Sequence, residues 1–143
     1  DEIEDTFPIQ EVSTGTAFII VPLKTLKSVK RAKVRLKRFK KLLNKKETIL
    51  GADALFVFCS ETVHPENDIH ARAFVHLHGI PEDPATGAAA AAFAGYLRDH
   101  GWPHGGQFTI TQGEDMGAPS IIEVQLSCEA GTSVQVSGQA RLI

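Results

Sequence analysis

Two carboxylates and a threonine stand just before an alanine-rich stretch, and they are the residues of this sequence best placed to do chemistry. Glu82, Asp83 and Thr86 crowd against the predicted start of a helix. The first N–H groups of a helix have no partner within it, so Thr86–Ala88 is predicted to favour a bound anion. Burying a carboxylate at a helix start costs desolvation free energy, so such a group is expected to be paired with another residue or to have a role in binding or catalysis. This loop is therefore the strongest functional candidate, with a simple well-capped helix start as the alternative.

The helix that follows this loop is predicted to be buried. Residues Ala88–Leu97 bring no charge to any face, and a helix that is apolar all round lies inside a protein. Thr86 is a good N-cap and Gly101 supplies a left-handed residue after the last turn, so the helix is expected to span about Gly87–His100. Its first turns are almost pure alanine, which lets neighbouring backbone approach closely. We expect a sheet to wrap around it.

The rest of the chain predicts one α+β domain over residues 1–143. Apolar residues recur every three or four positions over Leu26–Leu43, which predicts an amphipathic covering helix with at most one break. Apolar or alternating runs bounded by turn residues predict about eight strands. These strands are Pro8–Val12, Thr16–Leu23, Leu55–Ser60, Ile69–Leu77, Phe108–Thr111, Ile121–Ser127, Ser133–Ser137 and Ala140–Ile143.

The charges are distributed unevenly along the chain. Twelve of the 15 basic residues lie between Lys24 and Lys46 with no acidic residue among them, while the remainder carries all 17 acidic residues. Such a basic helix is either a solvated face or a surface that steers an anion or a nucleic acid. Phe39 is its only aromatic residue and no known nucleic-acid-binding motif accompanies it, so nucleic-acid binding is the weaker hypothesis.

Composition and cysteine usage favour a cytoplasmic protein. No stretch approaches the roughly 20 apolar residues of a membrane span, and the acidic start argues against a signal peptide. Cys59 and Cys128 lie in apolar, strand-like runs. Both are expected to be buried free thiols, which is consistent with a reducing compartment.

The histidines do not predict a metal site. His76 and His78 would face the same side of a strand and could share a metal ion, but no third ligand follows at a suitable spacing. We expect two histidines on a polar face instead. The chain also lacks a glycine-rich phosphate loop, a Cys/His cluster and a nucleophile elbow, so no cofactor is expected.

Three sequence motifs carry a family resemblance. His70–Phe74 followed by Gly79–Gly87 is similar to the pattern R-x-F…G-I-x-E-D-P-A-T-G-S-A. Val12–Phe18 is similar to V-S-T-G-x-P-F, and Gln112–Ser120 to Q-G-x-x-M-G-R-P-S. In this order, the motifs resemble those of PhzF-like proteins, the phenazine-biosynthesis isomerase family, over most of the chain.

The resemblance implies one half of a diaminopimelate-epimerase-like fold, with a curled, mostly antiparallel sheet around a buried central helix. In that family two pseudo-symmetric halves enclose the active site, and this chain resembles the carboxyl-terminal half. The family catalyses proton transfer without a cofactor, and the isomerase for which it is named acts on a dihydro-hydroxyanthranilate. A glutamate of the amino-terminal half acts there as general acid and base. This chain is therefore expected to lack one member of the catalytic pair.

The resemblance also implies roles for individual residues. Asp83 matches the aspartate of the family active site, so it is implied to be catalytic by holding a proton or orienting the substrate. Thr86, Gly87 and Ala88 match the helix start at which a substrate carboxylate would meet backbone N–H groups. Gly87 must be small for the ligand to reach the backbone. Ala88 stands where the family usually has serine, which removes a hydroxyl contact.

A missing half has a physical consequence for the surface. The face that would meet it should expose apolar side chains, and large exposed apolar patches usually find a partner. The simplest partner is a second copy related by a two-fold axis. We therefore expect a homodimer, or association with a separate amino-terminal half. Two further departures from the family motifs are Ala17 for the usual proline and Ala118 for the usual arginine.

Three functional hypotheses remain. The leading one is half of a cofactor-independent isomerase or epimerase that binds a small carboxylate and supports proton transfer. The second is a dimeric half-domain that binds a small carboxylate without catalysis. The third is a nucleic-acid-binding protein that uses the helix between Lys24 and Lys46. Exchange of solvent deuterium into an amino or hydroxy acid would separate the first hypothesis from the second.

Overall fold

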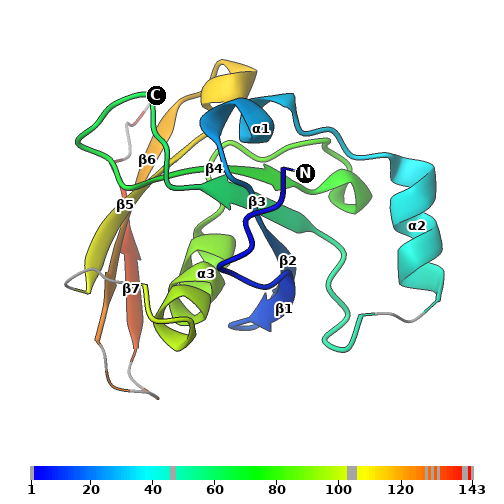
Figure 1. The fold of residues 1–143 in the computed structure, drawn as a ribbon, viewed down its shortest axis with the longest axis horizontal. Coiled ribbons are helices and arrows are strands. Elements are labelled where there is room, and N and C mark those ends of the chain that lie inside the picture. Colours follow the sequence, from blue (N-terminus) through cyan, green and yellow to red (C-terminus); the bar gives the residue numbers. More distant parts are fainter. Residues whose placement is uncertain are drawn as a thin grey trace.

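The described part of the chain forms one seven-stranded sheet with three α-helices (Figure 1). The computed structural model describes residues 2–45, 48–102, 106–127, 129, 131, 133–139 and 142. The strands are β1 (Gln10–Ser13), β2 (Ala17–Pro22), β3 (Leu55–Cys59), β4 (Ile69–Phe74), β5 (Gln107–Gln112), β6 (Ser120–Leu126) and β7 (Val134–Ser137). The helices are α1 (Leu26–Arg31), α2 (Leu36–Asn44) and α3 (Gly87–Asp99), with the short 3-10 helices η1 (His76–His78) and η2 (Glu114–Met116).

The strands lie in the sheet in the order in which they occur in the chain. The pairs β2/β3 and β4/β5 are parallel, and the other four neighbouring pairs are antiparallel. A parallel pair needs a crossover; the first crossover carries α1 and α2, and the second carries α3. The edge strands β1 and β7 both contact α3, so the sheet curls around this helix (Figure 1). The predicted α+β class is confirmed, with a mixed sheet.

The two faces of the sheet bury different helices. In β3, Phe56 and Phe58 belong to the core that contains α3, whereas Val57 and Cys59 pack with Val29 of α1. This alternation is the two-residue period of a strand. Because both faces are covered, the strand is apolar at every position.

The predicted covering helix is divided into α1 and α2. The carbonyl oxygens of Val29, Lys30 and Ala32 accept hydrogen bonds from Nη1 of Arg72, at 3.1, 3.0 and 3.1 Å. The guanidinium of Arg72, from β4, thus satisfies the carbonyl groups that are left without partners at the end of α1, and the helix ends there. In α2 the buried residue is Phe39, and the lysines and arginines face outward.

The strand predicted over Ile69–Leu77 ends three residues early. The N–H of Val75 donates to the carbonyl of Pro81, and Ala73 pairs with Asp83, so the chain turns back on itself after β4. His76 and His78 consequently lie in η1 and do not share a strand face, which corrects the sequence prediction. Among the described residues, no group of three His, Cys, Asp or Glu side chains is arranged to hold a metal ion.

The other strand predictions agree with the structure to within two residues at each end, where they can be compared. The helix α3 ends at Asp99, with His100 as its C-cap. The predicted strand Ala140–Ile143, apart from Leu142, and the predicted buried thiol of Cys128 lie outside the described residues.

Cys59 is a buried free thiol, as the sequence predicts. Burial raises the pKa of the Cys59 thiol to about 11, so the group is uncharged at neutral pH. In the described part of the chain, no helix has the length and apolar character needed to cross a membrane.

Glu11 of β1 anchors the segment that follows α2. Its carboxylate accepts hydrogen bonds from the N–H groups of Ile49, Leu50 at 3.2 Å and Ala52 at 3.0 Å. Burial acts to raise the pKa of Glu11, but the three N–H donors outweigh it and hold the pKa below its ordinary value of 4.5.

Glu11→Gln is therefore expected to lower the free energy of unfolding by about 1 kcal/mol at pH 7. A carboxyl whose pKa is lower in the folded state stabilises the fold above its unfolded pKa and loses this effect as the pH falls through the folded value. The difference between wild type and variant should hence shrink below pH 4.5. Urea denaturation at pH 7 and at about pH 3 measures it. A difference that stays constant with pH would contradict the assignment.

Candidate functional site

The start of α3 opens into a cleft on the surface. The cleft has a volume of about 570 Å³ and lies between the first residues of α3 and strands β6 and β7. Ala85 and Gly87 form one wall, and the opposite wall includes Ile122, Glu123 and Val136. A methyl group added to Gly87 would approach only Val136, at 3.9 Å, so a small ligand has access to the backbone here.

The backbone at this helix start is suited to an anion. Gly87 and Ala88 are exposed, and α3 has no acidic residue in its first turn and no side chain that caps its N–H groups. The first intrahelical bond of α3 runs from the N–H of Ala90 to the carbonyl of Thr86, at 3.0 Å. The preceding N–H groups point out of the helix toward its positive end.

Thr86 occupies the N-cap position, but its side chain does not cap the helix. Its hydroxyl instead donates to Oδ2 of Asp83 at 2.8 Å and accepts from Nε2 of Gln112 at 2.8 Å. Thr86 is buried, and its N–H donates to Oε1 of Gln112 at 3.3 Å. Thr86 is thus the N-cap residue, as predicted, but its hydroxyl is engaged with Asp83 and Gln112 instead of with the helix.

Gln112 holds the loop in place, and the sequence reasoning did not identify it. It is fully buried at the end of β5. Its two N–H bonds go to the carbonyl of Asp83, at 2.6 Å, and to the hydroxyl of Thr86. With the bond from the Thr86 N–H, both polar atoms of the side-chain amide have partners. A glutamine that ends a strand just before glycine is the signal that could have revealed it.

Asp83 is half-buried and lies three residues before Thr86. One carboxylate oxygen accepts a hydrogen bond from the hydroxyl of Thr86. Its other carboxylate oxygen has no hydrogen-bond partner among the described residues. One oxygen thus orients the carboxylate, and the other remains able to accept a proton or a hydrogen bond.

Glu82 is paired rather than available for chemistry. Arg72 binds it in a bidentate manner, with Nε at 2.9 Å and Nη2 at 2.8 Å from the two carboxylate oxygens. The two side chains are 11% and 10% exposed. Glu82 holds the pKa of Arg72 above its ordinary value, chiefly through this hydrogen bonding. The guanidinium also lies 4.7 Å from the ring centre of Phe74.

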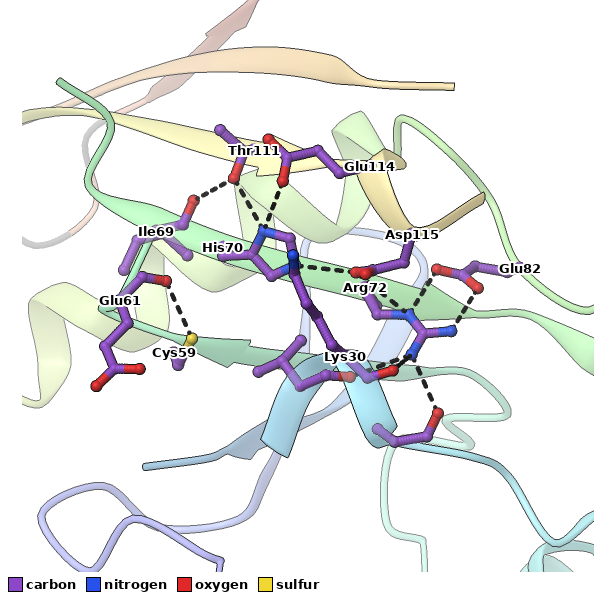
Figure 2. A network of polar contacts seen from close by, with 12 residues as sticks. Lys30, Cys59, Glu61, Ile69, His70, Arg72, Glu82, Thr111, Glu114 and Asp115 are labelled. Carbon is purple, nitrogen blue, oxygen red and sulfur yellow. Dashed lines mark hydrogen bonds and ion pairs between the residues drawn. The ribbon is translucent and has the colours of Figure 1, made fainter. Parts of the chain in front are cut away.

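His70 forms a second polar cluster beside this ion pair (Figure 2). The hydroxyl of Thr111 donates to the carbonyl of Ile69, and its oxygen also lies 3.2 Å from Nδ1 of His70. Nε2 of His70 lies 3.0 Å from a carboxylate oxygen of Asp115. That same oxygen is 3.9 Å from Nε of Arg72, which joins the two clusters (Figure 2). The combined network ties β4, β5 and η2 together below the loop that carries Asp83.

The structure thus divides the predicted site residues into two groups. Gly87 and Ala88 present exposed backbone, and Asp83 presents a carboxylate close to them in the chain. Thr86 and Glu82 are engaged in internal contacts that hold the loop. The arrangement is able to bind a small anion at the start of α3 and to accept a proton or hydrogen bond beside it.

Comparisons with known proteins match the whole chain. A family model described as phenazine biosynthesis-like protein (PhzC-PhzF) matches residues 1–143. An uncharacterized isomerase of Bacillus subtilis, YfhB, is 33% identical over 138 residues, which are 96% of this chain and 45% of that protein. Trans-2,3-dihydro-3-hydroxyanthranilate isomerase of Pseudomonas chlororaphis is 40% identical over 70 residues, 47% of this chain and 25% of that protein.

The fold is also similar to a solved structure. The phenazine biosynthesis protein of the PhzF family from Bacillus anthracis aligns with a TM-score of 0.77 and 25% sequence identity. The alignment covers 94% of this chain and 46% of that one. The chain therefore spans slightly less than half the length of the relatives that it matches over nearly its whole extent.

Proposed function

The chain belongs to the phenazine biosynthesis-like (PhzC-PhzF) family, and on this premise we propose that it is the carboxyl-terminal half of a cofactor-independent isomerase or epimerase. It binds a small carboxylate substrate at the start of α3 and supports proton transfer there. The observation that carries the proposal is the exposed start of α3 at Gly87 and Ala88, which follows the oriented carboxylate of Asp83 in the chain and at which Gly87 lines a cleft. Several relatives are named isomerases.

In this proposal the N–H groups of Gly87 and Ala88 hold the substrate carboxylate at the positive end of α3. Asp83 orients a substrate amine or hydroxyl, or holds a proton, through the carboxylate oxygen that Thr86 does not occupy. Thr86 and Gln112 keep the loop in position. The second acid–base group is a glutamate of the amino-terminal half. That half is supplied by another segment or by a partner chain.

The second candidate is a dimeric half-domain that binds a small carboxylate without catalysis. The observation that favours it is Ala88, whose methyl group is exposed at the site where the resemblance implies a serine hydroxyl. With no hydroxyl at this position, binding rests on the backbone N–H groups alone. In this case the partner is a second copy of the chain, and no proton is exchanged with the ligand.

Two measurements test both candidates, a titration with anthranilate and an exchange experiment with a hydroxy acid or amino acid. Titration of labelled chain should shift the amide resonances of Gly87 and Ala88 before others, because their N–H groups meet the carboxylate. Deuterium incorporation from solvent into a hydroxy acid or amino acid should be lowered by about 100-fold or more in Asp83→Asn. Asp99→Asn, at the exposed other end of α3, is the matched control and should leave incorporation unchanged.

The outcomes are separable. Amide shifts together with exchange that depends on Asp83 support the isomerase. Amide shifts without exchange, also when the amino-terminal half is supplied, support the non-catalytic half-domain. If neither resonance moves at saturating anthranilate, both candidates are wrong about the start of α3.

A further inference from the structure

The basic segment between β2 and β3 has no part in the proposed site. Eight of its basic side chains are exposed and have no carboxylate partner among the described residues. We call them the basic face: Lys27, Lys30, Lys33, Arg35, Lys37, Arg38, Lys40 and Lys41. No acidic residue lies between Lys24 and Lys46, so the charge of this face is uncompensated along the chain. A partner for it must be anionic.

An exposed apolar cluster adjoins the basic face. Ile9, Leu42, Ile49 and Leu50 line one shallow hollow, and we call these four residues the apolar patch. They are 55%, 38%, 92% and 53% exposed, respectively. Leu42 belongs to α2, so the patch and the basic face meet on the same helix. Large aliphatic side chains gathered at such exposure mark an interaction surface.

The fold presents both features outward. In α2 Phe39 is the buried residue, and the helix stands away from the sheet at the end of the molecule opposite β7 (Figure 1). The segment with Ile49 and Leu50 is held by the carboxylate of Glu11, through backbone N–H groups only. The backbone of this segment is therefore held in place while the two side chains remain exposed.

We propose that the basic face and the apolar patch together form a docking surface for an anionic lipid bilayer. The lysines and arginines lie against the negative headgroups, and the aliphatic side chains enter the boundary between headgroups and acyl chains. A basic amphipathic helix flanked by apolar side chains has the composition of such an interface. The inference is independent of the proposed function. The cleft at α3 is built by β6 and β7, at the other edge of the sheet.

A nucleic acid fits the same charge less well. Binding to single strands relies on exposed aromatic rings for stacking, and Phe39, the aromatic residue of this segment, is buried. The four residues of the apolar patch would remain in water beside a phosphate backbone. A bilayer uses both the charge and the exposed aliphatic surface.

Co-sedimentation of the chain with vesicles tests the proposal. The chain should bind phosphatidylcholine vesicles that contain about 30% phosphatidylserine, bind less as salt is raised, and not bind pure phosphatidylcholine vesicles. Lys37→Gln combined with Lys41→Gln should weaken binding roughly 30-fold, since each basic residue near such a surface contributes about fivefold. Both side chains are exposed, so the fold should be unaffected.

Two further variants are needed. One tests whether the position of the lost charge matters or only the net charge, and the other tests the contribution of apolar contact to vesicle binding. Gln107→Glu combined with Gln135→Glu changes the net charge equally, on exposed positions of β5 and β7, and should leave vesicle binding nearly unchanged. Ile49→Ser should weaken vesicle binding by about tenfold, because this side chain is buried in lipid only when docked.

The proposal is overturned by any of three results. One is the absence of binding to anionic vesicles at low salt. Another is an equal loss of binding in the charge-matched control. The third is retention on double-stranded DNA that exceeds vesicle binding and does not change in Ile49→Ser, which would assign the basic face to a nucleic acid instead.

Discussion

Arg72→Ala is expected to lower the free energy of unfolding by about 3 to 5 kcal/mol. The substitution leaves the largely buried carboxylate of Glu82 without its bidentate partner. It also removes the donor shared by the carbonyl groups of Val29, Lys30 and Ala32 at the end of α1. Unpaired buried charge and unsatisfied carbonyls both disfavour the folded state. Chemical denaturation followed by circular dichroism measures the change.

Arg98→Ala is the matched control for this prediction. Arg98 pairs with Asp99 at 3.2 Å, and the Asp99 side chain is 63% exposed. Because this carboxylate is in contact with solvent, the pair contributes at most about 1 kcal/mol. Arg72→Lys should lie between the two alanine variants, because an ammonium group keeps the charge but not the bidentate geometry. Equal losses in Arg72→Ala and Arg98→Ala would mean that the network around Glu82 does not stabilise the fold.

Gly113→Ala is expected to destabilise the chain by about 3 kcal/mol or more. Gly113 has a φ of 79°, which an alanine adopts only with strain. Its added Cβ would also lie 2.9 Å from the carbonyl oxygen of Pro84 and closer still to that of Ala118. Since Pro84 follows Asp83, relief of the contact with Pro84 is expected to shift the loop at the start of α3. Thermal or urea unfolding gives the loss of stability.

Gly117→Ala isolates the effect of backbone strain. Gly117 has a similar φ of 72°, but nothing lies within 4 Å of an added Cβ. This variant should lose only about 1 kcal/mol. The amide resonances of Gly87 and Ala88 should move in Gly113→Ala and stay in place in Gly117→Ala. Similar losses in both variants would show that the contacts with Ala118 and Pro84 carry little energy.

Much of the architecture follows from patterns that are local in the sequence. The charge-free run of α3, the apolar strands and the three- to four-residue period of α1 and α2 each reflect which faces must leave water. Gly101, with a φ of 70°, follows the C-cap of α3, as its residue type predicts. Such signals depend on residues within one or two turns of each other, so they can be read before the fold is known.

The sequence pointed to the loop at the start of α3 as a candidate site, which stays a prediction, but not to the residues that hold this loop in place. The exposed backbone of Gly87 and Ala88 follows from residue types near a helix start. The partners of Thr86 could not be inferred from the sequence. Its hydroxyl accepts a hydrogen bond from the side-chain amide of Gln112, 26 residues away, and does not cap its own helix. Similarly, Glu82 was expected to be paired or used, but nothing local identifies Arg72 as the partner.

The sequence alone therefore determined the fold class, the course of most strands, the buried helix and the loop that begins it. The tertiary structure alone decided where α1 ends, which carboxylate is paired and which is left facing outward. The physical reason is the range of the forces involved. Burial of apolar faces is written into local periodicity, whereas Arg72 meets the end of α1 and Gln112 meets Thr86 only after the sheet has closed around α3.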